Sequence, residues 1–150
     1  EIAAGIAAYE TVGRRANISD TGYITLVDDC YNANPTSTRC AIDSLSDNPG
    51  RRVCILGDML GQGENKEAIH YEIGKYAAES GAELILTVGE LSKHTCKGAK
   101  SVQAMHFESN AELIAALPGL IQKGDAVLVK ASNSMHFGEI SEALKLLKYL

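Results

Sequence analysis

The stretch that decides the fold is Tyr23-Ile24-Thr25-Leu26-Val27, followed by Asp28-Asp29-Cys30-Tyr31-Asn32-Ala33-Asn34-Pro35-Thr36-Ser37. The first part is mostly apolar and predicts a strand at about residues 22–28. The second part is rich in carboxylates and carboxamides and leads into a helical pattern at about 35–46, where Asn34 can cap and Pro35 fits the first turn. A polar loop between a strand and a helix is typical of the carboxyl edge of an open α/β sheet, where ligands bind.

The alternation of strand and helix continues along the chain. Short apolar runs predict strands at 52–56, 84–88, 102–107 and 126–130, and helical periodicity predicts helices at 64–79, 91–97, 109–122 and from about 137. Pro118 should kink or split the helix at 109–122. Strands that are apolar throughout indicate a mostly parallel sheet of about five or six strands covered on both faces. We therefore expect a three-layer, Rossmann-like α/β domain.

Composition and charge exclude several classes of protein. The chain has 150 residues, of which 45% are apolar and 22% charged, and its net charge is −5. This length suits one domain with a real core. The negative charge argues against a nucleic-acid surface, which needs a clustered basic face. No apolar run approaches the roughly 20 residues that span a bilayer, and the sequence does not start with a secretory leader.

The cysteines and histidines do not form a recognisable metal motif. Cys30, Cys40, Cys54 and Cys96 show no C-x-x-C spacing, so we expect buried free thiols of a reducing cytosol and no zinc or disulfide. The four histidines fall in separate elements, and packing or solvated roles are expected for them. We therefore predict a cytoplasmic protein without a metal site of its own.

Three polar loops follow predicted strands and should meet at one edge of the sheet. They are residues 28–37, 57–65 and 130–138. Each loop alone could be an ordinary turn or helix cap, because those features use the same residue types. Three such loops at one sheet edge predict a ligand site there.

The motifs that the sequence lacks narrow the chemistry. It has no G-x-G-x-x-G after the first strand and no G-x-x-x-x-G-K-[ST] loop for a triphosphate. It also lacks the G-x-S-x-G elbow of an α/β-hydrolase. The residues thus predict a ligand-binding domain without its own phosphate loop, which contributes to a site that another domain completes.

These residues resemble a known family. The run Asp-Asp-x-Tyr-Asn-Ala-Asn-Pro-x-Ser at 28–37 resembles the signature of MurF, the UDP-N-acetylmuramoyl-tripeptide D-alanyl-D-alanine ligase family of the Mur ligases. Segments 55–60, 64–70 and 129–135 agree with it in order and spacing, and Gly13-Arg14 resembles the Gly-Arg that closes the central domain of Mur ligases. The resemblance covers essentially the whole chain.

The resemblance implies a three-domain ligase, of which residues 13–150 are the carboxy-terminal domain and 1–12 a remnant of the central ATPase domain. Such a ligase uses ATP to phosphorylate the terminal carboxylate of UDP-MurNAc-tripeptide. The amine of D-Ala-D-Ala then attacks the acyl phosphate, and ADP and phosphate leave. ATP and Mg²⁺ would be bound mainly by the central domain. The carboxy-terminal domain would close over the nucleotide and exclude water. Alone, it should be inactive.

Roles follow from the resemblance position by position. Arg14 would be catalytic and point at the ATP phosphates. The nucleotide side would comprise Asp29, which would accept hydrogen bonds from the ribose, and Tyr31, Asn32 and Asn34. The D-Ala-D-Ala side would comprise Asp58, Lys130, Ser132 and Asn133. A solvated strand-end lysine is the alternative for Lys130.

Several positions depart from the family pattern. Asn133 stands where the family usually has Arg, Ala131 replaces Gly, Gly138 replaces an acidic residue, and Leu60-Gly61-Gln62-Gly63 replaces Leu-Glu-Leu-Gly. These changes affect the dipeptide side more than the nucleotide side. Two alternatives stay open: another Mur-type or folylpolyglutamate-type amide ligase, and a stand-alone ligand-binding Rossmann-like domain.

Overall fold

The protein is built around one six-stranded sheet. The computed structural model describes residues 17–149, with Tyr149 described by its backbone alone. The strand order is β1-β2-β6-β3-β4-β5. The strands are β1 Asn17–Asp20, β2 Thr25–Asp28, β3 Arg52–Gly57, β4 Leu84–Val88, β5 Gln103–Phe107 and β6 Ala126–Lys130. Only β1 is antiparallel to its neighbour, and the other described pairs are parallel.

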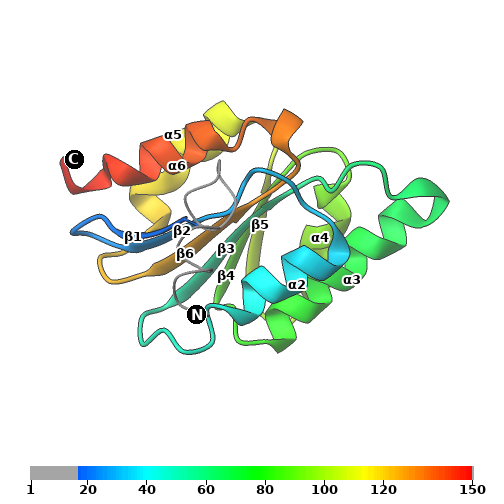
Figure 1. Cartoon of the computed structure of the whole chain (residues 1–150), viewed down its shortest axis with the longest axis horizontal. Helices are drawn as coiled ribbons and strands as arrows, with labels where there is room; N and C mark the ends of the chain where they lie inside the picture. Colours follow the sequence, from blue (N-terminus) through cyan, green and yellow to red (C-terminus); the bar gives the residue numbers. More distant parts are fainter. Residues whose placement is uncertain (1–16, 150) are drawn as a thin grey trace, which may run out of the picture.

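Helices cover both faces of the sheet, so the expected three-layer α/β architecture is confirmed (Figure 1). One face carries α2 Pro35–Asp43, α3 Lys66–Glu79 and α4 Ser92–Gly98, and the other carries α5 Asn110–Leu120 and α6 Gly138–Lys145. Three short 3₁₀ segments complete the described elements: η1 Gly63–Asn65, η2 Asn133–Met135 and η3 Leu147–Tyr149.

Two apolar cores lie on opposite faces of the sheet. Along β3, Val53 and Ile55 pack into the core under α5 and α6, whereas Cys54 and Leu56 pack into the core under α2 and α3. Side chains of successive strand residues point to opposite faces, so a central strand buried on both sides must be apolar at every position. This accounts for the unbroken apolar runs in the sequence.

The structure corrects two expectations. Residues 17–20 form the edge strand β1, which the sequence does not predict, and all four are exposed, so no apolar pattern marks them. The helix at 110–120 is not split, because Pro118 lies near its end. Proline has no backbone N–H, so Pro118 removes one hydrogen bond from the helix. The fully buried Leu113 and Leu117 pack the helix against the sheet.

Other expectations concern single residues or lie outside this part of the chain. All four cysteines are free, as predicted, but Cys40 is exposed and Cys96 only partly buried. Within residues 17–149 no helix has the length and apolar character needed to cross a membrane. Residues 1–12 and Arg14 lie outside the described residues.

Candidate functional site

The three polar loops meet at the carboxyl edge of the sheet, as the sequence predicts. Strands β2, β6 and β3 are adjacent and parallel, so the segments that follow them leave the sheet on the same side (Figure 1). Contacts join all three loops. The Nζ of Lys130 donates to the carbonyl of Asn32 at 2.8 Å, and the Oγ of Ser132 accepts from the N–H of Leu60 at 2.9 Å.

The first loop is held by its own hydrogen bonds. Asn34 caps α2 in a reciprocal pair with Ser37, and Pro35 occupies the first turn, as expected. The Oδ1 of Asn32 accepts from the N–H of Ala33 at 2.9 Å. Tyr31 remains 43% exposed. The loop therefore presents Tyr31 and Asn32 to the outside from a fixed backbone.

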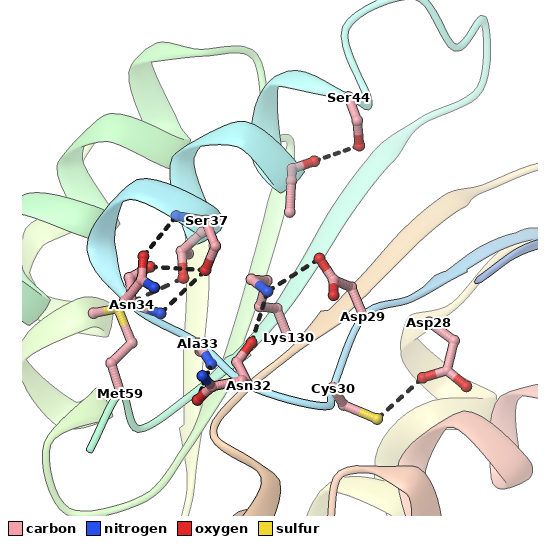
Figure 2. A network of polar contacts seen from close by, with 12 residues as sticks. Asp28, Asp29, Cys30, Asn32, Ala33, Asn34, Ser37, Ser44, Met59 and Lys130 are labelled. Carbon is pink, nitrogen blue, oxygen red and sulfur yellow. Dashed lines mark hydrogen bonds and ion pairs between the residues drawn. The ribbon is translucent and has the colours of Figure 1, made fainter. Parts of the chain in front are cut away.

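Asp29, near the start of this loop, forms an ion pair with Lys130 at the end of β6 (Figure 2). Their Oδ2 and Nζ atoms are 3.0 Å apart, and the side chains are 15% and 3% exposed. Burial raises the pKa of the Asp29 carboxyl, the positive charge of Lys130 opposes that rise, and the negative charge of Asp28 adds to it. Lys130 is thus not a solvated strand-end lysine, which removes that alternative.

Asp58 connects the second loop to the start of α4. Its Oδ1 accepts from the backbone N–H and from the hydroxyl of Ser92, both at 2.8 Å. Its backbone carbonyl accepts from the N–H of Ser132 at 3.0 Å. Gly89 is required beside this carboxylate, because its φ is +122° and an added Cβ would lie 2.3 Å from Oδ1 of Asp58.

His70 on α3 fixes the second loop, residues 57–65, by a hydrogen bond to its backbone. Its Nε2 lies 2.9 Å from the backbone N of Met59, and its Nδ1 lies 2.6 Å from the carbonyl of Lys66. A neutral ring that carries its proton on Nδ1 satisfies both contacts. Burial lowers the pKa of His70, which favours this neutral form. The packing role expected for the histidines is confirmed here, together with a specific hydrogen bond.

A pocket of about 260 Å³ opens between the first loop and the segment that links β6 to α6. It is lined by Cys30, Asn133, His136, Gly138 and Glu139. Two of the departures from the family pattern, Asn133 and Gly138, therefore lie in the wall of one pocket. An Arg and an acidic residue at these positions would occupy part of this space.

The structure divides the predicted site residues into groups. Asp29, Asn32 and Lys130 lie together, Asp58 and Ser132 form a second linked group, Asn133 lies on the pocket, and Asn34 is used as a helix cap. Sequence reasoning missed Ser92, the link between His70 and Met59, and the pocket residues His136 and Glu139. No sequence signal marks these contacts, because the fold alone brings the partners together.

Comparisons with known proteins place this fold in one family. Residues 13–133 match the model of the Mur ligase, glutamate ligase domain. This match, over most of the chain, shows that the chain belongs to the Mur ligase family, and the six-stranded α/β sheet agrees with it.

Curated relatives and solved structures agree with the family match. The UDP-N-acetylmuramoyl-tripeptide--D-alanyl-D-alanine ligase of Escherichia coli is 37% identical over 96% of this chain, and that of Bacillus subtilis is 31% identical over 96%. The chain spans about a third of their lengths, 32% and 33%.

A crystal structure of MurF from Acinetobacter baumannii superposes with a TM-score of 0.81 at 30% identity, over 87% of this chain and 30% of that one. The structure of MurF ligase from Thermotoga maritima in complex with ADP gives 0.78 at 26% identity, over 93% and 32%.

Proposed function

We propose that this chain is the carboxy-terminal domain of an ATP-dependent, ADP-forming ligase that joins D-Ala-D-Ala to UDP-MurNAc-tripeptide. The product would be a precursor of the peptidoglycan cell wall, which cell shape and division require. The tripeptide carboxylate would be activated as an acyl phosphate and then attacked by the dipeptide amine. ATP, the UDP-linked precursor and the free thiols of the chain support a cytoplasmic location.

One observation carries this proposal. The Asp29 to Pro35 loop is held by its own hydrogen bonds and an ion pair at the carboxyl edge, and it lies in a chain of which 96% matches two relatives named as ligases of this activity. The sequence has no phosphate loop, so the edge would form one half of a site. The other half, with the triphosphate loop, magnesium ligands and tripeptide site, would come from the central and amino-terminal domains.

The polar groups of the first loop fit a nucleotide. Asp29 is partly buried, and its Oδ1 makes no hydrogen bond to any residue between 17 and 149, so this oxygen can accept from a ribose hydroxyl. Tyr31 and Asn32 are exposed beside it. Arg14 would supply charge to the phosphates, as its position in the family pattern implies.

The dipeptide side rests on fewer free groups. Asp58 and Ser132 are buried and hydrogen-bonded within the domain. We therefore propose that they hold the loops of this edge in place and do not contact the dipeptide. Asn133 is exposed on the pocket and is the predicted residue of this group that can touch a ligand directly without rearrangement.

Phosphate release by the full-length protein tests the proposal. It should require ATP, UDP-MurNAc-tripeptide and D-Ala-D-Ala together. Changing Asn32 to Ala or Asp29 to Asn should lower turnover severely and leave the domain folded. Asp47→Asn is a matched control, because Asp47 is exposed in the turn before β3. Release that is independent of the dipeptide, or full turnover in both site variants, would argue against this function.

A second measurement separates the ligase domain from a stand-alone binding domain. Calorimetric titration of the 150-residue chain with Mg-ATP should show weak or no binding, because the phosphate-binding half is absent. Sub-micromolar affinity would favour a domain that works alone.

A further inference from the structure

Lys130 is a buried lysine, and within residues 17–149 the polar contacts of its ammonium go to one loop. It ends β6, and its side chain is 3% exposed. Its ammonium lies 3.0 Å from Oδ2 of Asp29 and donates to the carbonyl of Asn32 at 2.8 Å (Figure 2). Both partners belong to the first loop. These two contacts of Lys130 therefore join β6 to the loop proposed to face the nucleotide.

This arrangement limits what else Lys130 can do. A buried ammonium is stable only when it is paired and hydrogen-bonded. If a substrate carboxylate were to capture Lys130, Asp29 would lose its counter-charge in a partly buried position. The geometry therefore opposes direct binding of the dipeptide carboxylate by this lysine.

The two oxygens of Asp29 are used differently. Oδ2 is held by Lys130, while Oδ1 has no hydrogen-bond partner among residues 17–149. The backbone N–H of Asp29 donates to the carbonyl of Val129 at 2.9 Å, so the chain around the carboxylate is also fixed to β6. One oxygen is anchored, and the other is left to accept a hydrogen bond from outside.

We propose that Lys130 is a positioning residue for the nucleotide side of the site, acting through Asp29 and Asn32, and not a ligand of the dipeptide. This inference rests on the proposed ligase function. Lys130 aims the free oxygen of Asp29 and fixes the Asn32 carbonyl, so that the loop needs no reordering when the nucleotide arrives. Preorganisation of this kind lowers the cost of binding.

The electrostatics supply a further consequence. Among residues 17–149, two charges bear on the Asp29 carboxyl, namely Lys130 from β6 and Asp28 at the end of β2, and the positive charge of Lys130 opposes the rise in pKa that burial and Asp28 cause. Removing the ammonium must therefore raise the pKa of Asp29 further. The acid limb of the pH profile of kcat/KM for ATP should move to higher pH.

The test is a set of variants in the full-length protein. Lys130→Met removes the charge and keeps the length of the side chain. It should raise KM for ATP by about 10- to 100-fold, the range expected when a binding group is misplaced, and leave KM for D-Ala-D-Ala within about twofold. Lys130→Arg keeps a positive charge beside Asp29. The acid limb of its pH profile of kcat/KM for ATP should therefore lie close to that of the wild type. The control is Lys123→Met, since Lys123 is exposed in the turn before β6.

A double variant separates an effect through Asp29 from a direct contact. Asp29→Asn should raise KM for ATP about as much as Lys130→Met, and Asp29→Asn with Lys130→Met should be no worse than either alone. The inference would be overturned if the two single variants' increases in KM for ATP multiplied in the double variant. It would also be overturned if Lys130→Met raised KM for D-Ala-D-Ala alone. The double variant leaves no buried charge unpaired, so it answers the question even if Lys130→Met fails to fold.

The failure of this inference is distinguishable from that of the proposed function. If the wild-type protein does not release phosphate with the tripeptide precursor and the dipeptide, the function is wrong. If it does, and Lys130→Met changes the dipeptide KM alone, the function stands and Lys130 contacts the dipeptide.

Discussion

The imidazole of His70 accepts a hydrogen bond from the backbone N–H of Met59, with 2.9 Å between Nε2 and N. The other ring nitrogen faces the carbonyl of Lys66 at 2.6 Å. Protonation of the ring would break the contact with Met59, because the charged ring has two donors and no acceptor. The contact with Lys66 would remain, since Nδ1 still donates. The position of the second loop over α3 is therefore linked to the neutral form of one histidine.

This link predicts a pH dependence of stability. Burial lowers the pKa of His70 below its usual 6.5, although the hydrogen bond to Lys66 and the charge of Asp58 oppose this shift and His94 adds to it. As pH falls through 6.5, the unfolded chain gains a proton that the folded chain does not, so the free energy of unfolding should decrease and then level off below the folded-state pKa. Urea unfolding of the wild type between pH 8 and pH 5 measures this decrease.

His70→Gln is the matched variant for that experiment. Glutamine offers an acceptor for Met59 and a donor for Lys66 but does not titrate in this range. Its unfolding should depend less on pH than that of the wild type, while the decrease due to His106, whose pKa burial also lowers, should remain. Parallel pH profiles for the two proteins would contradict the assignment. His70→Ala leaves the Met59 N–H without a partner and should cost about 1–3 kcal/mol at pH 8.

Asp58 is predicted to stabilise the start of α4. The residue before this helix is Leu91, which provides no side-chain cap, and the carboxylate of Asp58 accepts two hydrogen bonds from Ser92 in its place. Asp58→Ala should therefore lower the free energy of unfolding by about 1.5–3 kcal/mol, as for hydrogen bonds to charged groups. Ser92→Ala removes only the hydroxyl contact and should cost less. Denaturant unfolding of both variants measures these losses. An unchanged midpoint for Asp58→Ala would show that the contact with Ser92 does not stabilise the domain.

The sequence predicts the central sheet well because buried parallel strands leave continuous apolar runs, as at 84–88 and 126–130. It also predicts that three loops share an edge, since this follows from parallel strand direction. The edge strand β1 escaped prediction because its four residues are all exposed, so no burial constrains their polarity.

The internal contacts of the site could not be predicted for a different reason. Lys130 and Asn32 are 98 positions apart, and Asp58 and Ser92 are 34 positions apart. Residue types at a strand end do not say whether a charge faces solvent or a partner from another loop. The sequence therefore identifies which residues gather at the edge, and the fold determines which are anchors and which stay free.

Arg51 is predicted to stabilise the opposite end of the sheet without affecting the site. Its Nε and one terminal nitrogen bind both oxygens of Asp125, at 3.0 and 2.8 Å, and Asp125 is 2% exposed. Arg51→Ala would leave this buried carboxylate without its counter-charge, with the N–H of Gln122 as its remaining donor, and should cost about 3–5 kcal/mol. The adjacent Arg52, with a single long contact of 3.3 Å to Ser46, is the control. In thermal unfolding Arg52→Ala should change the midpoint far less, and equal shifts would count against the pairing.

Asn133 tests how the pocket contributes to the dipeptide side. It stands where the family pattern has Arg, and it lines the pocket together with His136 and Glu139. Asn133→Arg would place a permanent positive charge at the mouth of the pocket, where it can bind a carboxylate through two parallel hydrogen bonds. In the full-length protein this variant should lower KM for D-Ala-D-Ala and leave KM for ATP unchanged.

The neighbouring position supplies the control for that variant. Ser134 is also exposed but does not line the pocket, so Ser134→Arg adds the same charge one residue away. If both variants lower the dipeptide KM equally, the gain is general electrostatic attraction and the pocket is not the contact. If Asn133→Arg leaves that KM unchanged, Asn133 does not contact the dipeptide, and the carboxylate must be bound by residues of another loop or domain.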